Sequence, residues 1–537
     1  MKIYPYEKLR QAMATENFNP CGGGTPFNAS NVLDGNWYLV PNDAAKKDDI
    51  VRELRLEIEE HTPRGMHTRI VLLFRRFPSH IGVPRLYGFE HYGCPKFVRQ
   101  FAGEAIDPTH LTDMKLSLRK EQETCRAALN SKFFSPTQLA NGSAGCVLNL
   151  ACGQGKTFVG LQHIVDIGKK TLIICHSNVS VSQWVNHIRK ALPHVTVLEF
   201  HGDNSFPSTD IVVATIHPLV LKRSVEGYDR AKYGEWLKRF GNVIYDEIHI
   251  FGAPLFSEIF DLIHAAAQLG LSATPERTDG TEKGFILKVG PVLDAQSELH
   301  IAPPEFSVTV YPLTPPTPKL IAPTVESFAD GLRAMTSTEN RVTFLIATLE
   351  NHFVHRPNDN VLIFCNYLQE VEFLLSRLRT AFATEYIDKI CGDVCAENIA
   401  FMADTAKILV CTYKKGGTAF SPVRFRAVVI WSPTRAMITQ AVGRIQRWRD
   451  EEGMTLGPEG SWNTLPRTIY DFIDRGTVAA HQYYSGVREN NIVIPSRRAL
   501  YISKGYKVVR PQSERVDRRI EEEAVAAFAA LGFSSTN

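Results

Sequence analysis

The stretch Asn149-Leu150-Ala151-Cys152-Gly153-Gln154-Gly155-Lys156-Thr157 joins two segments with different patterns. The apolar run Cys146-Val147-Leu148 precedes it and predicts a strand, and Phe158-Val159-Gly160-Leu161 follows it and can open a helix. A glycine-containing loop between a strand and a helix presents backbone N–H groups and a helix N-terminus to phosphate oxygens. The stretch therefore predicts a phosphate-binding loop in an α/β fold.

Lys156 and Thr157 indicate which phosphates this loop would bind. A lysine at this place reaches the β- and γ-phosphates of a nucleotide, and the hydroxyl that follows holds Mg²⁺, so ATP and Mg²⁺ are the predicted cofactors. Leu150 occupies the place of the outermost glycine of the longer motif, which makes the match incomplete. Taken alone, the stretch is also compatible with an ordinary glycine-rich turn before a helix.

Length and composition set further limits. The chain has 537 residues, enough for several cores, and its hydrophobic content of 44% fits a folded, soluble protein. No apolar run reaches the roughly 20 residues that span a bilayer, and the start of the sequence lacks the apolar core of a signal peptide. The net charge of +3 means that nucleic-acid binding would rely on local basic patches. Cys391 and Cys395 have no second pair nearby, so no zinc site is expected.

A carboxylate pair follows another predicted strand. In Asn242-Val243-Ile244-Tyr245-Asp246-Glu247-Ile248-His249 the apolar strand ends in Asp246 and Glu247. ATP hydrolysis needs one carboxylate for the metal and one for the attacking water, both at the carboxyl edge of the sheet. Asp246 is therefore predicted to bind Mg²⁺, directly or through water, and Glu247 to orient or deprotonate the water. The alternative is an apolar strand that ends in Asp-Glu by chance.

The chain changes character along its length, and this predicts five parts. Alternating residues 54–58, the run 69–74 and a turn into an edge-type strand at 81–88 predict a small β-rich N-terminal domain. Strands 171–175, 210–214, 242–246 and 268–272 are continuous apolar runs, as a parallel sheet covered on both faces requires. A second such series contains strands 360–364, 406–410, 427–430 and 468–472. The predicted parts are 1–115, 116–300, a proline-rich linker at 301–335, 336–475 and a helical basic tail at 476–537.

The second carboxylate motif carries a resemblance to a known family. Asp246-Glu247-Ile248-His249, a DEIH box, is followed by Leu271-Ser272-Ala273-Thr274-Pro275, and together they resemble the superfamily 2 helicases. The segment 175–184 and Arg277-Thr278-Asp279 are similar to the corresponding stretches of XPB helicases. We therefore expect an XPB/UvsW-like helicase, as found in large DNA viruses and phages, with motifs from about 116 to 450. The fold that this implies is two tandem RecA-like P-loop NTPase lobes, with the β-rich domain before them and the tail after them.

The resemblance implies roles for individual residues around ATP. Adenine would be read by Arg119 and Gln122, and serine, threonine and histidine of the later motifs would couple hydrolysis to movement. Arginines of the second lobe would reach the γ-phosphate, where they neutralise charge only when the cleft is closed. Surface ion pairs on an amphipathic helix are the alternative for these arginines. The residues implied are, for ATP, Cys152, Gly153, Gln154, Gly155, Lys156 and Thr157; for coupling, His249, Ser272, Ala273 and Thr274; and, in the second lobe, Gln440, Arg444 and Arg447.

Contacts to nucleic acid are implied less sharply. Ser177, Gln183 and Thr215 in the first lobe, with Thr412 and Lys414 in the second, lie where the family grips the strand backbone without reading sequence. The fifth motif departs from the family, because Ala419 and Ser421 stand where many relatives have Gly and Asp. Trp184 fits either a core position or a base-stacking platform. The basic tail, which includes Arg497 and Arg498, fits either a solvated face or a nucleic-acid contact.

Together these features predict an ATP-dependent DNA helicase or translocase that unwinds or remodels duplexes in viral or phage-like transcription, repair or recombination. Expected partners are DNA at single-strand/duplex junctions and transcription or replication proteins, with no membrane. We expect an intracellular protein, in the cytoplasm or nucleus of a host cell or in a virion. Three alternatives stay open: an RNA helicase, a restriction-type ATPase subunit without a nuclease constellation, and a nucleic-acid-binding scaffold with little ATPase activity.

Overall fold

The computed structural model of the chain describes most residues between 31 and 509. Apart from residues 152–154, the chain divides after Ala302 into two compact units. Among the described helices, none is both long and apolar enough to cross a membrane. The described residues are 31–42, 45–62, 65–151, 153–202, 206–220, 230–252, 256–277, 280–299, 306–313, 336, 338–392, 396–416, 425–432, 438–445, 467–474, 487–489, 492–494, 496–503 and 506–509.

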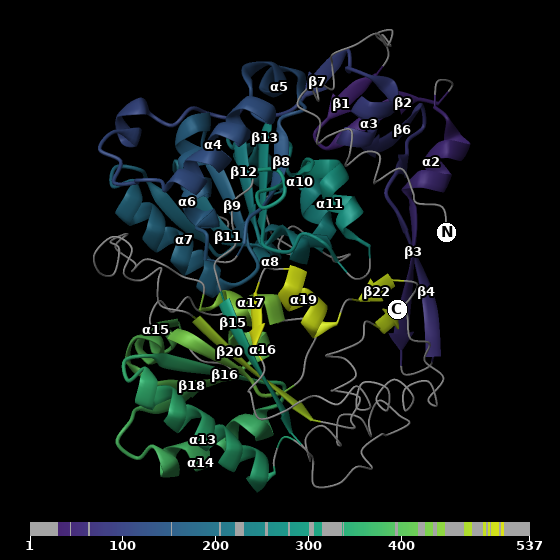
Figure 1. The fold of residues 1–537 in the computed structure, drawn as a ribbon. Helices are drawn as coiled ribbons and strands as arrows, with labels where there is room; N and C mark the ends of the chain where they lie inside the picture. The colour runs from purple at the N-terminus through teal and green to yellow at the C-terminus, as the bar shows by residue number, and fades with distance from the viewer. Residues whose placement is uncertain are drawn as a thin grey trace. The chain divides into compact units, whose positions relative to one another are not determined.

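The first unit contains a seven-stranded sheet with the strand order β10-β11-β9-β12-β13-β8-β14 (Figure 1). Every pairing between these strands is parallel, as the continuous apolar runs predicted. The strands are β8 (Gly145–Asn149), β9 (Thr171–Cys175), β10 (Val197–Phe200), β11 (Ile211–Thr215), β12 (Asn242–Asp246), β13 (Ala267–Ser272) and β14 (Val292–Asp294).

Helices cover both faces of this sheet. Leu148 of β8 joins one core cluster with side chains of α4, α6 and α7, and its neighbour Val147 joins a second cluster with α8, α9, α10 and α11. Because successive strand residues point to opposite faces, each strand contributes to both clusters. The helices are α4 (Lys120–Lys132), α5 (Pro136–Asn141), α6 (Lys156–Ile167), α7 (Asn178–Ala191), α8 (Ile216–Val220), α9 (Arg230–Leu237), α10 (Ile259–Leu262) and α11 (Glu282–Val289).

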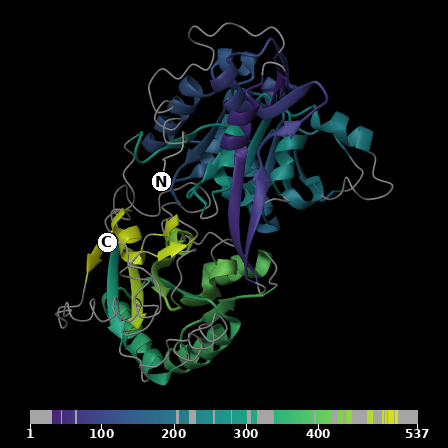
Figure 2. The same ribbon diagram turned by 90° about the vertical axis from the view of Figure 1, so that its right-hand side faces the viewer.

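The N-terminal part is β-rich, as predicted, and belongs to the first compact unit. It has a five-stranded sheet of order β5-β6-β2-β1-β7 and a separate antiparallel ribbon, β3–β4, seen in purple in Figure 2. Its elements are β1 (Val32–Asp34), β2 (Trp37–Pro41), α2 (Lys47–Leu54), β3 (Arg55–Thr62), β4 (Gly65–Leu72), β5 (Arg75–Arg76), β6 (His80–Pro84), α3 (Arg85–Tyr92) and β7 (Phe97–Arg99).

Residues 81–88 differ from the predicted turn and edge strand. Residues 81–84 belong to β6, which pairs with β2 on one side and β5 on the other, so it lies inside the sheet. Pro84 ends the strand and is the residue before α3, consistent with its fixed φ of −57°. Gly88 lies within α3, where a Cβ would stand 2.1 Å from the ring of Tyr38, so glycine permits this close packing.

Arg85 attaches the N-terminal part to the first lobe. Its side chain is fully buried, and its guanidinium donates to the carbonyls of Gly142 (3.2 Å), Ala144 (3.3 Å) and Val289. Val289 is the last residue of α11, so one of these carbonyls belongs to the negative end of a helix dipole. Burial lowers the pKa of Arg85 to about 10.

A second buried polar contact crosses the same boundary. The Asn36 amide donates to the carbonyls of Phe260 (2.8 Å) and Ile263 (3.2 Å), and its oxygen accepts from Gln268 Nε2 at 2.6 Å. Gln268 Oε1 in turn accepts from the Tyr245 hydroxyl at 3.2 Å. Since buried polar groups are costly when unpaired, these matched partners fix how the N-terminal part sits on β12 and β13.

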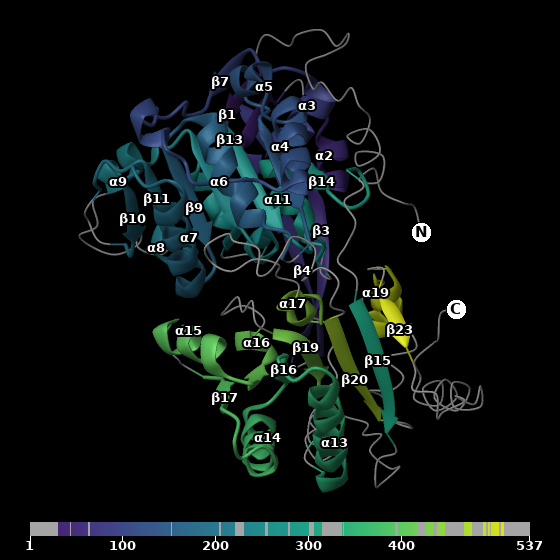
Figure 3. The ribbon, with the colours of Figure 1, turned by 60° about the vertical axis from the view of Figure 1, so that its left-hand side comes forward.

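The second unit repeats the architecture of the first. Its sheet has the order β17-β18-β16-β19-β20-β15-β23, again with every pairing parallel (Figure 3). Val361 points toward α13 and α14, and Leu362 toward α15, α16, α17 and α19. The strands are β15 (Phe306–Leu313), β16 (Asn360–Cys365), β17 (Ile387–Ile390), β18 (Ile408–Thr412), β19 (Phe425–Ile430), β20 (Arg467–Asp474) and β23 (Lys507–Val509).

Two RecA-like lobes in tandem are therefore the fold of this chain, as the resemblance implied. The second lobe has the helices α13 (Glu339–His355), α14 (Leu368–Ala381), α15 (Ala396–Thr405), α16 (Tyr413–Gly416), α17 (Ile438–Gly443) and α19 (Arg497–Ser503), and a two-stranded sheet of β21 (Val487–Glu489) and β22 (Ile492–Ile494).

Parts of the expected linker and tail belong to the second sheet. The alternating strand expected at 306–310 is part of β15, which lies between β20 and β23 in the sheet. In the expected tail, β23 adds a further strand, and α19 packs on the core through Tyr501. The described part of the tail is thus less helical than predicted. Its apolar residues are used for packing onto the second lobe.

Arg497 anchors the tail through a buried ion pair. Its guanidinium makes two hydrogen bonds to the Asp471 carboxylate, at 3.1 and 2.9 Å, and the Tyr501 hydroxyl donates to the same carboxylate at 2.9 Å. The Arg497 and Asp471 side chains are 1% and 0% exposed. Arg497 is therefore a structural residue of the second lobe and is not available to nucleic acid.

We predict that Arg497→Ala destabilises the second lobe by about 3–5 kcal/mol, because it leaves the Asp471 carboxylate buried without its cation. Arg498 is the matched control, since it is the next residue and is exposed. Arg498→Ala should change stability by less than about 0.5 kcal/mol. Denaturant unfolding of the full-length protein measures both changes. Equal effects of the two substitutions would contradict a structural role for the ion pair.

Candidate nucleotide-binding site

Three neighbouring strands bring the predicted motifs together at one edge of the first sheet. β13 lies between β8 and β12, with Ser272 beside Asn149 and Leu271 beside Asp246. The loop that leaves β8 is tied to β13 by a hydrogen bond from the Leu150 N–H to the Ser272 carbonyl at 3.0 Å. The carboxyl edge of a parallel sheet is where such folds bind ligands.

The glycine loop after β8 has the backbone of a phosphate cradle. Gly153 and Gly155 have φ values of 75° and 86°, a region that residues with a Cβ rarely adopt. Gly155 directly precedes α6, whose first residues are Lys156 and Thr157. Both side chains are half-buried, and Lys156 Nζ donates to the Leu150 carbonyl at 3.2 Å. The helix N-terminus and a lysine amine therefore face the same loop.

Gln122 connects the start of α4 to this loop. It is buried, and its Oε1 accepts from the Arg119 N–H at 2.9 Å, which fixes the first turn of α4. Its amide nitrogen lies 2.1 Å from the place where a Cβ of Gly155 would be. The two residues predicted to read adenine therefore lie against the phosphate loop, and Gly155 must be glycine to admit the Gln122 amide.

Asp246 and Glu247 form a partly desolvated acidic pair at the end of β12. Burial, and secondly the charge of Glu247, raises the pKa of the Asp246 carboxyl above its usual range. A hydrogen bond from Trp184 and the positive charge of Lys156 oppose this shift. Glu247 has a φ of 52°, a left-handed conformation that costs a residue other than glycine free energy. Strain of this kind is typical of sites where side-chain direction matters.

These residues fit Mg²⁺ and ATP. Mg²⁺ prefers oxygen ligands, and the Thr157 hydroxyl and the Asp246 carboxylate supply two of them. A cation beside Asp246 and Glu247 would also neutralise charge that the site holds in partial burial. Thr157 and Asp246 are therefore the residues that would hold the metal, and the loop before α6 is the part that would hold the phosphates.

A chain of contacts joins Glu247 to β13. His249 Nδ1 lies 3.4 Å from Glu247 Oε2 and 2.9 Å from Ser272 Oγ. Ser272 Oγ also accepts from the Thr274 N–H at 3.0 Å. Burial lowers the pKa of His249, which favours the neutral imidazole. The residues predicted to couple hydrolysis to movement, including the buried Ala273, are thus brought into contact.

Arg277 supports this chain and was not assigned a role from the sequence. Its Nη1 donates to the His249 carbonyl at 2.6 Å, and its Nε to Thr281 Oγ1 at 2.6 Å. A Cβ on Gly252 would stand 2.8 Å from the Arg277 side chain. The similarity of this segment to XPB helicases was the only signal in the sequence, and it did not indicate a contact to His249.

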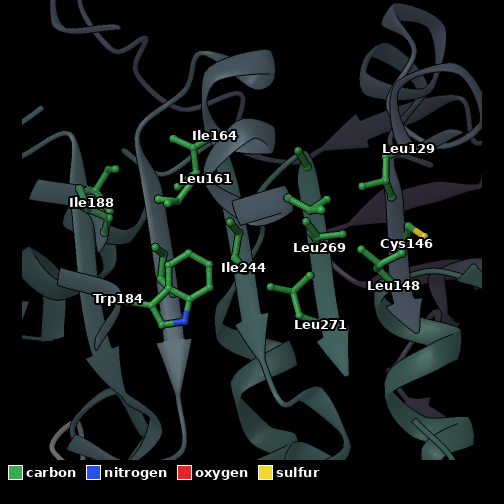
Figure 4. Close-up of a cluster of buried hydrophobic side chains, with 14 of the residues drawn as sticks. Leu129, Cys146, Leu148, Leu161, Ile164, Trp184, Ile188, Ile244, Leu269 and Leu271 are labelled. Atoms are coloured by element: carbon green, nitrogen blue, oxygen red, sulfur yellow. The ribbon is translucent and has the colours of Figure 1, made fainter. Parts of the chain in front are cut away.

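Trp184 is a core residue that also contacts the site. It is 2% exposed and packs in the cluster shown in Figure 4, which excludes a base-stacking platform in this conformation. Its indole N–H donates to the Asp246 side chain. This contact was missed by sequence analysis, since it joins residues from separate elements and follows no spacing rule.

The other predicted residues lie near the ends of strands or outside the described structure. Ser177 caps α7 by accepting from the Ser180 N–H at 3.2 Å, Gln183 is half-buried on α7, and Thr215 and Thr412 are half-buried at the ends of β11 and β18. Arg444 is half-buried just after α17. Cys152, Arg447, Ala419 and Ser421 lie outside the described residues, as do the side chains of Lys414 and Gln440.

Comparisons with known proteins agree with this geometry. Residues 115–277 match the family model described as "Type III restriction enzyme, res subunit". The XPB helicase/translocase subunit of general transcription and DNA repair factor IIH from Schizosaccharomyces pombe is 29% identical over 210 residues, which are 38% of this chain and 25% of that protein. This chain belongs to the superfamily 2 helicases of the XPB-like type.

Two further relatives extend the match. DNA 3′-5′ helicase XPB from Mycobacterium tuberculosis is 27% identical over 245 residues, which cover 44% of this chain and 43% of the relative. A putative ATP-dependent RNA helicase of Acanthamoeba polyphaga mimivirus is 25% identical over 275 residues, covering 49% and 48%. The chain therefore spans less than half the length of each of these three relatives.

Gly155→Ala should abolish ATP binding, because the new Cβ would overlap the Gln122 amide and force the loop to move. Gly168, the residue after α6, is the matched control: it also has a positive φ, of 64°, but its Cβ would meet no atom closer than 4.0 Å. Gly168→Ala should cost about 1–2 kcal/mol of stability through backbone strain and leave binding intact. Titration with a fluorescent ATP analogue tests this, and equal binding by both variants would contradict it.

Proposed function

We propose that this chain is an ATP- and Mg²⁺-dependent DNA translocase or helicase that unwinds or remodels duplex DNA. The observation that carries the proposal is the grouping of Lys156, Thr157, Asp246 and Glu247 at one sheet edge, with His249 and Ser272 in contact behind them. Two of the relatives are described as DNA helicases or translocases, which supports DNA as the polymer.

In this proposal each residue of the first lobe has a defined task. The amides before α6 and the Lys156 amine bind the phosphates, and Glu247 orients the attacking water and accepts its proton. The bound metal neutralises charge on the transferring phosphoryl group. His249 and Ser272 transmit a change at Glu247 to β13, because they contact each other at 2.9 Å.

Arg444 and Arg447 of the second lobe complete the proposed mechanism. An arginine that reaches the γ-phosphate only when two lobes close makes hydrolysis depend on closure, which is the stroke of a motor. The proposed polymer contacts are Ser177, Gln183 and Thr215 in the first lobe and Thr412 and Lys414 in the second. Backbone contacts of this kind do not depend on base sequence.

Lys156→Ala should reduce ATP hydrolysis to background while the protein remains folded, because the phosphates lose their main cation. Lys190→Ala is the matched control, since Lys190 is exposed in the last turn of α7. It should hydrolyse ATP like the unaltered protein. Steady-state phosphate release measures activity, and thermal unfolding checks the fold. Full activity in Lys156→Ala would refute the assignment of the ATP site.

The polymer is tested by measuring ATP hydrolysis with single-stranded DNA, duplex DNA, RNA or no polymer, each over a salt series. We expect DNA to stimulate hydrolysis several-fold, and the effect to weaken with salt as phosphate contacts are screened. Stimulation by RNA alone would instead support an RNA helicase, the alternative suggested by the description of the mimivirus relative. Hydrolysis that no polymer changes would contradict a motor on nucleic acid.

A setting in transcription, repair or recombination of a virus or phage is part of the same proposal. It is supported by the description of one relative as a subunit of a transcription and DNA repair factor and by the viral source of another. Transcription or replication proteins are the proposed partners.

A further inference from the structure

Trp184 makes two kinds of contact that place it between a helix and the ATP site. Its ring is buried in the core cluster that α6 and α7 form on the sheet, and its indole N–H donates to the Asp246 carboxylate. In Figure 4 the indole nitrogen lies on the side of the ring toward the carboxyl ends of the strands, where β12 ends in Asp246. Apolar packing alone would not require a nitrogen at this place.

The surroundings of the ring fix its position. β9 lies beside β12 in the sheet, so the helix that follows β9 passes near the end of β12. Gly160 of α6 leaves space for the ring, since a Cβ there would stand 2.8 Å from Trp184 Cη2. The donor is therefore held from two sides, by its own helix and by α6.

A neutral donor suits a metal-binding carboxylate. Lys156 already supplies a positive charge near Asp246, and a second cation would compete with Mg²⁺. An indole N–H orients one carboxylate oxygen without adding charge, and it leaves the other lone pairs for the metal or its water. Such outer contacts around metal ligands commonly change metal affinity or activity 10- to 100-fold when they are removed.

We propose that Trp184 is a positioning residue for Mg²⁺–ATP, because its indole N–H orients the Asp246 carboxylate that receives the metal. This inference rests on the proposed ATP site and adds a residue that the family motifs around the nucleotide did not assign. It makes the first helix after β9 a part of the metal site.

The test compares Trp184→Phe with Trp236→Phe in the full-length protein. Trp236 is also buried in the first lobe, and its indole N–H donates to the Pro207 carbonyl at 3.2 Å, in a contact that involves no site residue. Binding of a non-hydrolysable ATP analogue is titrated with and without Mg²⁺, and the ratio of the two dissociation constants is the readout. This ratio reports the metal contribution and does not depend on turnover.

We expect Trp184→Phe to reduce the Mg²⁺-dependent ratio about tenfold while binding without Mg²⁺ stays within twofold. Trp236→Phe should leave the ratio unchanged. If Trp184→Phe keeps the ratio of the unaltered protein, Trp184 is only a core residue and the inference is overturned. If the unaltered protein binds no analogue at all, the proposed function fails with it, so the two failures are distinguishable.

A second measurement keeps the inference testable if Trp184→Phe does not fold. The chain has six tryptophans, and ¹⁵N labelling of their indoles gives one N–H resonance for each. Asp246→Asn replaces the charged acceptor by a neutral amide, so the Trp184 resonance should shift while that of Trp236 stays in place. A spectrum in which Asp246→Asn moves no indole resonance would overturn the inference.

Discussion

The register of four parallel strands is the constraint on which the rest of this structure depends. β9, β12, β13 and β8 are neighbours, and their pairing places Asp246, Ser272 and the loop after Asn149 at one edge. A slip of one residue would turn each side chain to the opposite face. Both core clusters of the first lobe resist such a slip, because every strand contributes alternating side chains to the two faces. The apolar core therefore positions a polar site.

Electrostatics at this edge is balanced by contacts rather than by exposure to water. Asp246 and Glu247 are adjacent carboxylates in partial burial, which raises the pKa of Asp246, and Lys156 and Trp184 oppose that shift. Glu247 is also held at a positive φ, and such strain persists only where the surrounding structure determines it. The contacts of His249 with Ser272, and of Arg277 with the His249 carbonyl, provide that support.

Two buried arginines have a comparable role at the ends of the chain. Arg85 joins the N-terminal part to the first lobe through three carbonyls, and Arg497 joins the tail to the second lobe through Asp471. Removal of either side chain would leave buried polar groups unpaired, and such groups are costly. The N-terminal part and the described part of the tail are therefore integral to the two compact units rather than loosely attached.

The amino-acid sequence by itself determined the two parallel sheets, because continuous apolar runs separated by helices admit few other folds. It also predicted Lys156, Thr157, Asp246 and Glu247, whose chemistry depends on local order along a loop or a strand end. It did not determine that residues 85–88 start a helix, that Arg497 is buried, or that Trp184 donates to Asp246. These facts were decided by the tertiary structure, because each depends on partners far away in the chain, and neither periodicity nor motif spacing encodes which distant groups meet.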